Sequence, residues 1–356
     1  MLAENSMGEL AQLAGTAGAE VVGSVSQQLS DPNRSYYVGK GKLEEIIALK
    51  ESLDYNVVIL DDELSPLQQR NLEDALQVKI IDRVALILDI FAGRAHTHEG
   101  RLQVELAQHQ YLMPRLAGQW SHLERLGGGI GTRGPGESQL ETDRRIIHKK
   151  IQRLQTKIEE VRKQRNLYRQ KRQKSGIPVV ALVGYTNAGK STLLNAMCRA
   201  DILTEDRLFA TLDPTTRRLT LPDKRTVLLT DTVGFIRKLP PVIVRAFRAT
   251  LEELAEASLL LHVVDLASPD ASRQCQTVED ILNELDLSDK PRITVLNKID
   301  VIPGGGQHHD EASGLRFFYE KGYIDSEGMV LLSAEKKWGF KRLLELISHH
   351  IQQPTK

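Results

Sequence analysis

Short apolar runs alternate with helix-spaced apolar residues over residues 20 to 92. Three of the runs predict strands, at 21–25, 56–60 and 78–81. Two helices are predicted between them, over 42–53 and 65–76. Ser65 can cap the second helix, and Pro66 suits its first turn. This alternation predicts a small parallel α/β domain.

Two long helical stretches follow. The first is predicted from about Gly100 to Arg125 by one apolar stripe: Leu102, Leu106, Met113, Leu116, Trp120 and Leu123. Pro114 lies inside it and should kink or break the helix. The second, from about Glu141 to Lys174, carries a seam with alternating spacings of four and three: Ile147, Ile151, Leu154, Ile158 and Val161. The glycine-rich segment 127–136 cannot form regular structure. We therefore predict an antiparallel two-helix hairpin with a glycine-rich tip.

Strand and helix patterns alternate again from Val179 to about His350. Five strands are predicted, at 179–183, 226–230, 259–264, 292–296 and 329–332. The predicted fold class is α/β, with an N-terminal parallel α/β domain, the long hairpin and a doubly wound domain. We expect the boundaries 1–100, 101–176 and 177–353. Ligands should bind where the strands of the third domain end.

The amino-acid composition excludes few classes of protein. The 356 residues suit two or three domains with sizeable cores, and 47 basic residues balance 47 acidic ones. Cys198 and Cys275 are the only cysteines, and their spacing suggests neither a metal site nor a disulfide. No run approaches the roughly 18 apolar residues of a membrane span, and the N-terminus lacks signal-peptide order. We expect a soluble, cytoplasmic protein with no transmembrane segment.

Charge is uneven along the second long helix. Residues 141–174 contain thirteen Lys and Arg against four Asp and Glu, a local net charge of +9. Such a run is often only a solvated helix face. Its single sign and the neighbouring Arg133 in the glycine-rich tip favour nucleic-acid binding. We expect RNA rather than DNA, because no element resembles a module that reads a DNA groove.

The strongest chemical pattern is a phosphate-binding loop at residues 184–191. Two glycines separated by four residues precede Lys190 and Ser191, between a predicted strand and a predicted helix. Loop amides and the helix N-terminus would favour a phosphate. Lys190 would neutralise the β- and γ-phosphates, and the Ser191 hydroxyl would bind Mg²⁺.

Three further motifs lie at the ends of predicted strands. They follow the second, the fourth and the last strand of this domain. After the second strand, Asp231 would hold Mg²⁺ through water, and the Gly234 amide would sense the γ-phosphate. After the fourth strand, the Asp300 carboxylate can accept two hydrogen bonds from guanine but not from adenine. At the last strand, a backbone amide of 333–335 can meet guanine O6. Four motifs in this order predict a GTP site.

The loop at 209–216 is the expected first switch, which completes the Mg²⁺ shell with a threonine. Thr211, Thr215 and Thr216 all compete for this position. At the position after Gly234, many GTPases carry a glutamine that orients the attacking water. Here Phe235 cannot form a hydrogen bond with water, so slow intrinsic hydrolysis is expected, with the water ordered by another group.

The expected nucleotide contacts are Gly184, Tyr185, Thr186, Asn187, Ala188, Gly189, Lys190, Ser191, Thr192, Phe209, Ala210, Thr211, Leu212, Asp213, Asp231, Thr232, Val233, Gly234, Asn297, Lys298, Ile299, Asp300, Ser333, Ala334 and Glu335. The expected catalytic residues are Lys190, Thr211 and Gly234. The expected magnesium ligands are Ser191, Thr211 and Asp231.

These motifs resemble the HflX family of GTPases. The resemblance rests on GYTNAGKS, FATLDPT, DTVGF, NKID, SAE and the glycine-rich GGIGTRGPGESQLETDRR. It also covers YYVGKGK and LILDIFAGRAHTHEGRLQVELAQ, and so nearly the whole chain. It implies that Thr211 is the magnesium-binding threonine and Ser191 its partner. The chain also resembles potassium-activated GTPases at Asn187, which implies a possible K⁺ ligand there.

The family resemblance implies GTP-dependent binding to the large ribosomal subunit and its RNA, with splitting or rescue of stalled ribosomes under stress. Some members have been linked to ATP binding or RNA unwinding. Compared with the family, we expect the C-terminal domain of some members and the usual opening strand to be missing. The alternative is a GTP-regulated RNA-binding module, scaffold or ribosome-assembly factor, in which hydrolysis only times release. We expect a monomer.

Overall fold

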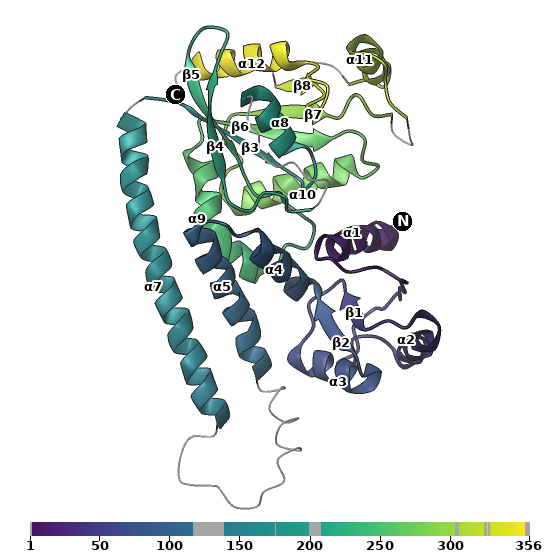
Figure 1. The fold of residues 1–356 in the computed structure, drawn as a ribbon. Helices are drawn as coiled ribbons and strands as arrows, with labels where there is room; N and C mark the ends of the chain where they lie inside the picture. Colours follow the sequence, from purple (N-terminus) through teal and green to yellow (C-terminus); the bar gives the residue numbers. More distant parts are fainter. Residues whose placement is uncertain are drawn as a thin grey trace, which may run out of the picture. The chain divides into compact units, whose positions relative to one another are not determined.

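The computed structural model describes residues 2–116, 139–174, 176–198, 208–302, 306–323, 326 and 328–352. The chain forms two compact units, Met1–Val161 and Arg162–Lys356 (Figure 1). The boundary falls inside the second long helix. The finer division into three domains stays a prediction. No helix in the described ranges is long and apolar enough to cross a bilayer.

The first unit contains two of the three expected strands, and these two pair in parallel. Its α/β elements are α1 (Leu2–Thr16), α2 (Lys40–Leu53), β1 (Val57–Leu60), α3 (Pro66–Leu76), β2 (Lys79–Asp82) and α4 (Arg83–Arg94). β1 and β2 pair in parallel, with Val57 opposite Lys79. The Ser65 side chain accepts a hydrogen bond from the Gln68 amide in a capping box, as its position before Pro66 predicts. α1 and α4 were not predicted.

The predicted strand at 21–25 is wrong. In the structure this segment has no regular secondary structure, and Val21 and Val22 are each 48% exposed. Over the described residues the sheet of this unit has the order β1-β2, so the segment is not paired with either strand. β-branched residues favour a strand only when a partner strand satisfies the backbone, and here none does.

The long helix pair is present. α5 (His98–Leu112) ends in a 3-10 turn, Met113–Arg115, so Pro114 breaks the helix as predicted. α7 (Gln139–Lys174) packs its predicted seam against α5 in one apolar cluster: Leu102, Leu106, Ile151 and Leu154, with Met113, Ile147, Ile158 and Val161 at its edges. The Lys150 ammonium lies 2.8 Å from the Glu105 carboxylate across the pair. Trp120, Leu123 and the glycine-rich tip lie outside the described residues.

The second unit is built on a six-stranded sheet of order β4-β5-β3-β6-β7-β8. Its strands are β3 (Val179–Gly184), β4 (Thr215–Thr220), β5 (Thr226–Asp231), β6 (Leu259–Asp265), β7 (Arg292–Asn297) and β8 (Met329–Leu331). All five predicted strands are present. β4 was not predicted, and it pairs antiparallel with β5, so the sheet is mixed.

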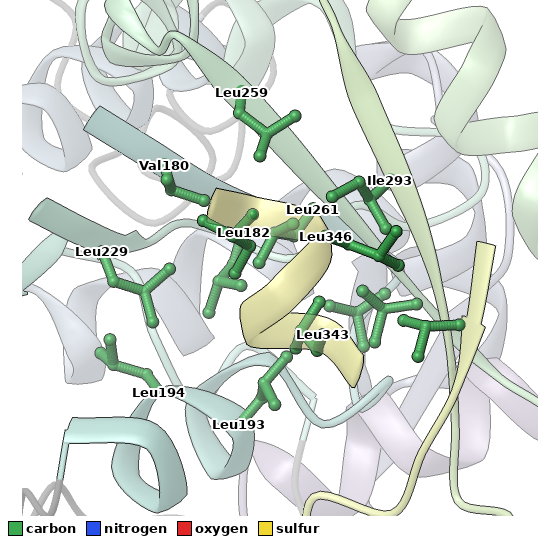
Figure 2. Close-up of a cluster of buried hydrophobic side chains, with 14 of the residues drawn as sticks. Val180, Leu182, Leu193, Leu194, Leu229, Leu259, Leu261, Ile293, Leu343 and Leu346 are labelled. Carbon is green, nitrogen blue, oxygen red and sulfur yellow. The ribbon is translucent and has the colours of Figure 1, made fainter. Parts of the chain in front are cut away.

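Helices cover both faces of this sheet (Figure 1). They are α8 (Lys190–Cys198), α9 (Pro241–Glu256), α10 (Ala271–Glu284), α11 (Glu311–Glu320) and α12 (Phe340–Gln352). Leu193 of α8 and Leu343 of α12 pack on one face, against Leu182 and Leu261 of the central strands (Figure 2). This core fixes the sheet, and the carboxyl ends of β3, β5 and β7 therefore form a rigid edge.

Candidate functional site

The loop between β3 and α8 passes very close to the end of β7. Gly189 adopts a φ of +94°, and a Cβ there would lie 2.2 Å from Asn297 Nδ2. The Asn297 amide nitrogen donates to the Ala188 carbonyl at 2.8 Å. Asn297 therefore braces the phosphate loop from the neighbouring motif, a role that the sequence pattern did not indicate.

Lys190 is a buried cation at the centre of the loop. It is 6% exposed, and its ammonium donates to the carbonyls of Gly184 at 3.2 Å and Tyr185 at 2.8 Å. Burial lowers the pKa of Lys190 to about 8, although the charge of Asp231 opposes this shift. A phosphate would supply the counter-charge that this buried ammonium lacks.

Three oxygen donors converge beside Lys190. The Ser191 hydroxyl donates to Asp231 Oδ2 at 2.6 Å and lies 2.8 Å from the Thr211 hydroxyl, which itself donates to Asp231 Oδ2 at 2.9 Å. Asp231 is fully buried, and its second oxygen has no hydrogen-bond partner among the described residues. Burial raises the pKa of Asp231, although Lys190 and both hydroxyls oppose that shift.

This donor set fits Mg²⁺. The ion takes oxygen ligands at about 2.0–2.1 Å in an octahedron, whose adjacent ligands are about 2.9 Å apart. The two hydroxyl oxygens already have that separation. The structure thus brings together the three residues expected to bind magnesium.

The other two threonines of the first switch lie elsewhere. Thr215 and Thr216 begin β4, and the Thr216 hydroxyl pairs with that of Thr230 across the sheet at 2.9 Å. Only Thr211 of these three reaches Ser191. In the same loop, Phe209 and Leu212 are buried, whereas Ala210 and Asp213 are partly exposed.

A backbone ladder joins the phosphate loop to the segment after β5. The Thr186 amide donates to the Phe235 carbonyl at 2.7 Å, and the Phe235 amide donates to the Gly184 carbonyl at 3.1 Å. Gly234 is held between them, since a Cβ there would lie 2.8 Å from Thr186 Cα and 3.0 Å from Lys190 Nζ. The Phe235 side chain is 1% exposed, so it points into the protein interior. Sequence patterns carry no signal for this ladder.

The motif after β7 has one buried carboxylate oxygen without a described partner and one lysine held in an ion pair by the protein. Asp300 is 4% exposed, and its Oδ1 has no partner among the described residues. Lys298 forms an ion pair with Asp265 at 2.7 Å, and Ile299 is buried. The Ala334 amide donates to Asn297 Oδ1 at 2.9 Å, which connects the segment after β8 to β7. The ion pair between Lys298 and Asp265 was not predicted. The available signal was the position of Asp265, a lone carboxylate at the end of the strongly apolar strand β6.

The remaining predicted residues lie around the same edge. A cavity of about 50 Å³ is lined by Thr186, Asn187, Gly189, Lys190, Ser191, Thr192, Phe209, Ala210, Thr211, Thr232 and Gly234. Asn187 is exposed at a φ of +62°. The Thr232 hydroxyl donates to the Leu182 carbonyl, Val233 and Ser333 are buried, and Glu335 is exposed. The loop that carries Thr211 forms part of the wall of this cavity, so its position shapes the space beside Lys190.

Three family models match consecutive parts of the chain. Residues 4–92 match a model described as GTP-binding GTPase N-terminal, and residues 94–172 match the GTP-binding GTPase Middle Region. Residues 179–298 match a model described as 50S ribosome-binding GTPase.

Several proteins named GTPase HflX are similar over most of the chain. That of Caldanaerobacter subterraneus subsp. tengcongensis is 52% identical over 355 residues, covering 99% of this chain and 78% of that protein. That of Escherichia coli strain K12 is 49% identical over 294 residues, covering 83% and 69%. Among solved structures, SsGBP in complex with GDP aligns with a TM-score of 0.50 and 26% identity, covering 96% of this chain and 94% of that one.

Proposed function

The chain belongs to the HflX family of GTPases, and from that premise we propose that it uses GTP to control binding to the large ribosomal subunit, and that it splits or rescues stalled ribosomes under stress. The observation that carries this proposal is the convergence of Ser191, Thr211 and Asp231 beside the buried Lys190. Ser191 comes from the phosphate loop, Thr211 from the first switch and Asp231 from the end of β5.

These residues would respond to the γ-phosphate in distinct ways. Lys190 would exchange its bonds to two carbonyls for bonds to phosphate oxygens. Thr211 lies on a loop that lines the cavity beside Lys190, and magnesium binding would order this loop. Bound Mg²⁺ would neutralise charge that develops between the β- and γ-phosphates. The state of the first switch would therefore depend on which nucleotide is bound.

Guanine specificity would come from Asp300. A buried carboxylate oxygen without a partner is costly, and guanine supplies donors that adenine lacks. Asn297 would support this site indirectly, since both ends of its amide are already used within the protein.

Slow hydrolysis without a partner follows from Phe235. Its side chain is buried, so neither its chemistry nor its position allows it to hold a water beside the γ-phosphate. A group from the ribosome, or K⁺ bound by the exposed Asn187, would take that role. A K⁺ ion there would add positive charge beside the phosphates.

Contact with ribosomal RNA would use the basic face of α7 within the first unit. Arg144, Lys149, Arg153 and Lys157 are all exposed, whereas the seam of the same helix is buried. RNA phosphates are the natural partners of such a surface. The family model named for 50S ribosome binding, which matches 179–298, supports the same partner.

Nucleotide-dependent co-sedimentation tests the proposal. The protein should pellet with large subunits in a non-hydrolysable GTP analogue and remain in the supernatant with GDP. With stalled ribosomes, GTP should release free subunits. The alternative, a GTP-regulated RNA-binding module or assembly factor, predicts binding without any release of subunits from stalled ribosomes.

A further inference from the structure

Away from the nucleotide, one buried histidine of the sheet faces a cysteine and a carboxylate. His262 lies in the middle of β6 and is 1% exposed. Its neighbours Leu261 and Val263 belong to the core beneath α8 and α12. Because side chains alternate along a strand, His262 points to the opposite face, where α10 packs.

α10 places two further donors over His262. Cys275 and Glu279 are four residues apart, so they lie on the same side of the helix. One donor atom of each of the three residues lies within 4.8 Å of the others. Glu279 Oε1 is 3.6 Å from His262 Nδ1.

A fourth side chain fixes the carboxylate. Arg292, at the start of β7, donates to Glu279 Oε2 at 2.5 Å. That bond leaves Oε1 directed to His262. Carboxylates that bind metals in proteins are commonly oriented in this way by a second hydrogen bond.

The donor set selects the class of ion. We propose that His262, Cys275 and Glu279 bind a zinc ion, with water in the fourth position. Sulfur, imidazole and carboxylate together suit Zn²⁺, whereas Mg²⁺ and Ca²⁺ prefer oxygen alone. Zinc bonds of about 2.0–2.3 Å place tetrahedral donors roughly 3.5 Å apart. The three donor atoms lie within 4.8 Å of one another, so the widest pair must close by at most about 1.3 Å. Cys275 and Glu279 are both partly exposed, which gives the ion a path from solvent.

Zinc here would connect α10 to the strand that supports the phosphate loop. Val263 pairs with Gly184, the first residue of that loop, and a Cβ on Gly184 would lie 2.3 Å from the Val263 carbonyl oxygen. Zinc bound at the adjacent His262 should therefore stiffen the base of the nucleotide site. Its ligands are distinct from the oxygen donors proposed for Mg²⁺.

Cobalt substitution tests the site on the full chain without an affinity tag, after chelator treatment. One equivalent of Co²⁺ should give a thiolate charge-transfer band and tetrahedral visible bands, and Zn²⁺ should abolish both. An excess of Mg²⁺ should leave them unchanged. Cys275→Ser should remove the charge-transfer band, and Glu279→Gln should weaken Zn²⁺ binding by more than about 100-fold. Nucleotide binding by each variant confirms that it is folded.

Cys198→Ser is the matched control, since Cys198 lies on α8, on the other face of the sheet. It should keep the complete cobalt spectrum. A protein that gives no thiolate band, or whose band survives Cys275→Ser, would show that the three residues form only a buried polar cluster. So would equal Zn²⁺ affinity in the wild type and Glu279→Gln.

Discussion

Asp300 and Asn297 share one motif but face different partners. Asn297 uses both atoms of its amide within the protein, on Ala188 and Ala334, while Asp300 Oδ1 is buried with no partner in the part of the chain that the structure describes. A buried carboxylate in this state gains most from a ligand with matching donors. Base selection should therefore depend on Asp300.

Replacing Asp300 with Asn should change which base is bound. The amide presents one donor and one acceptor, which mismatches guanine and suits xanthine. We expect GTP affinity to fall by more than about 100-fold and xanthosine triphosphate to become the better ligand. Isothermal titration with both nucleotides checks this. Unchanged GTP affinity would contradict the assignment of Asp300.

His262 should make the protein sensitive to acid. Burial lowers its pKa from 6.5 to about 4; nearby Glu279 opposes the shift, while Arg292 and Lys190 add to it. The neutral form is therefore favoured in the folded state, so its contribution to stability is complete above pH 6.5 and is lost as pH falls towards 4. Between pH 6.5 and about pH 4.5 the loss should be about 2 kcal/mol.

Urea unfolding of the full chain with chelator present measures this loss. His262→Gln should reduce the acid dependence, while His349→Gln, at an exposed position on α12, should leave it as in the wild type. Equal acid dependence in the wild type and His262→Gln would show that His262 is protonated as readily in the folded protein as in the unfolded chain.

Individual roles could be predicted where one residue type is chemically required. Lys190, Ser191 and Asp231 belong to motifs with fixed spacing, and the structure brings them together. The ion pair of Lys298 with Asp265 could not be predicted, because its partners are distant in sequence and meet only once β6 and β7 pair.

At the scale of elements, α7 has two different faces. Its seam packs on α5 through Ile151 and Leu154, and its opposite face carries exposed arginines and lysines. The seam fixes which side of the helix is presented to solvent. The basic face is therefore a surface with a defined orientation within the first unit.

Removing charge from this face should weaken RNA binding and its salt dependence. The set Arg144→Ala, Lys149→Ala, Arg153→Ala and Lys157→Ala leaves the Lys150–Glu105 pair and the seam intact. The slope of log affinity for large subunits against log salt should fall by about 3, since each phosphate contact releases somewhat less than one counterion.

Gln152→Ala with Gln155→Ala is the control, since both residues are exposed on the same helix and uncharged. This pair should keep the wild-type slope, and GTP affinity should stay unchanged in both variants. A wild-type slope in the four-residue variant would leave α7 as a spacer that does not contact RNA.

Elements were predictable where local pattern and packing agree. Pro114 and the seam of α7 show this, since a proline and a heptad-like spacing act locally. β4 was missed because Thr215–Thr220 alternates weakly and becomes a strand by pairing with β5. The segment 21–25 was wrongly predicted as a strand for the converse reason: the apolar run exists, but no strand pairs with it.

On the scale of the whole molecule, nucleotide binding would rearrange contacts that the site already makes. The Thr211 hydroxyl already donates to Asp231 and lies 2.8 Å from the Ser191 hydroxyl. GTP would insert its phosphates and Mg²⁺ among these groups. Part of the free energy of GTP binding would then drive the rearrangement of the first switch. This rearrangement would couple nucleotide binding to partner binding.

Lys190→Ala and Ser191→Ala should each abolish GTP turnover. The first removes the only described ammonium next to the magnesium donors, and the second removes one of those donors. Steady-state phosphate release with large subunits present is the measurement. A rate within about twofold of the wild type would contradict the assigned phosphate loop.

GTP turnover with and without large ribosomal subunits tests whether the ribosome completes a site that is slow by itself. Phe235 is buried and cannot hold the attacking water, so the isolated protein should hydrolyse GTP slowly. Saturating large subunits should raise the rate at least about tenfold, as partner-supplied groups do in other GTPases. Equal rates with and without subunits would contradict the account.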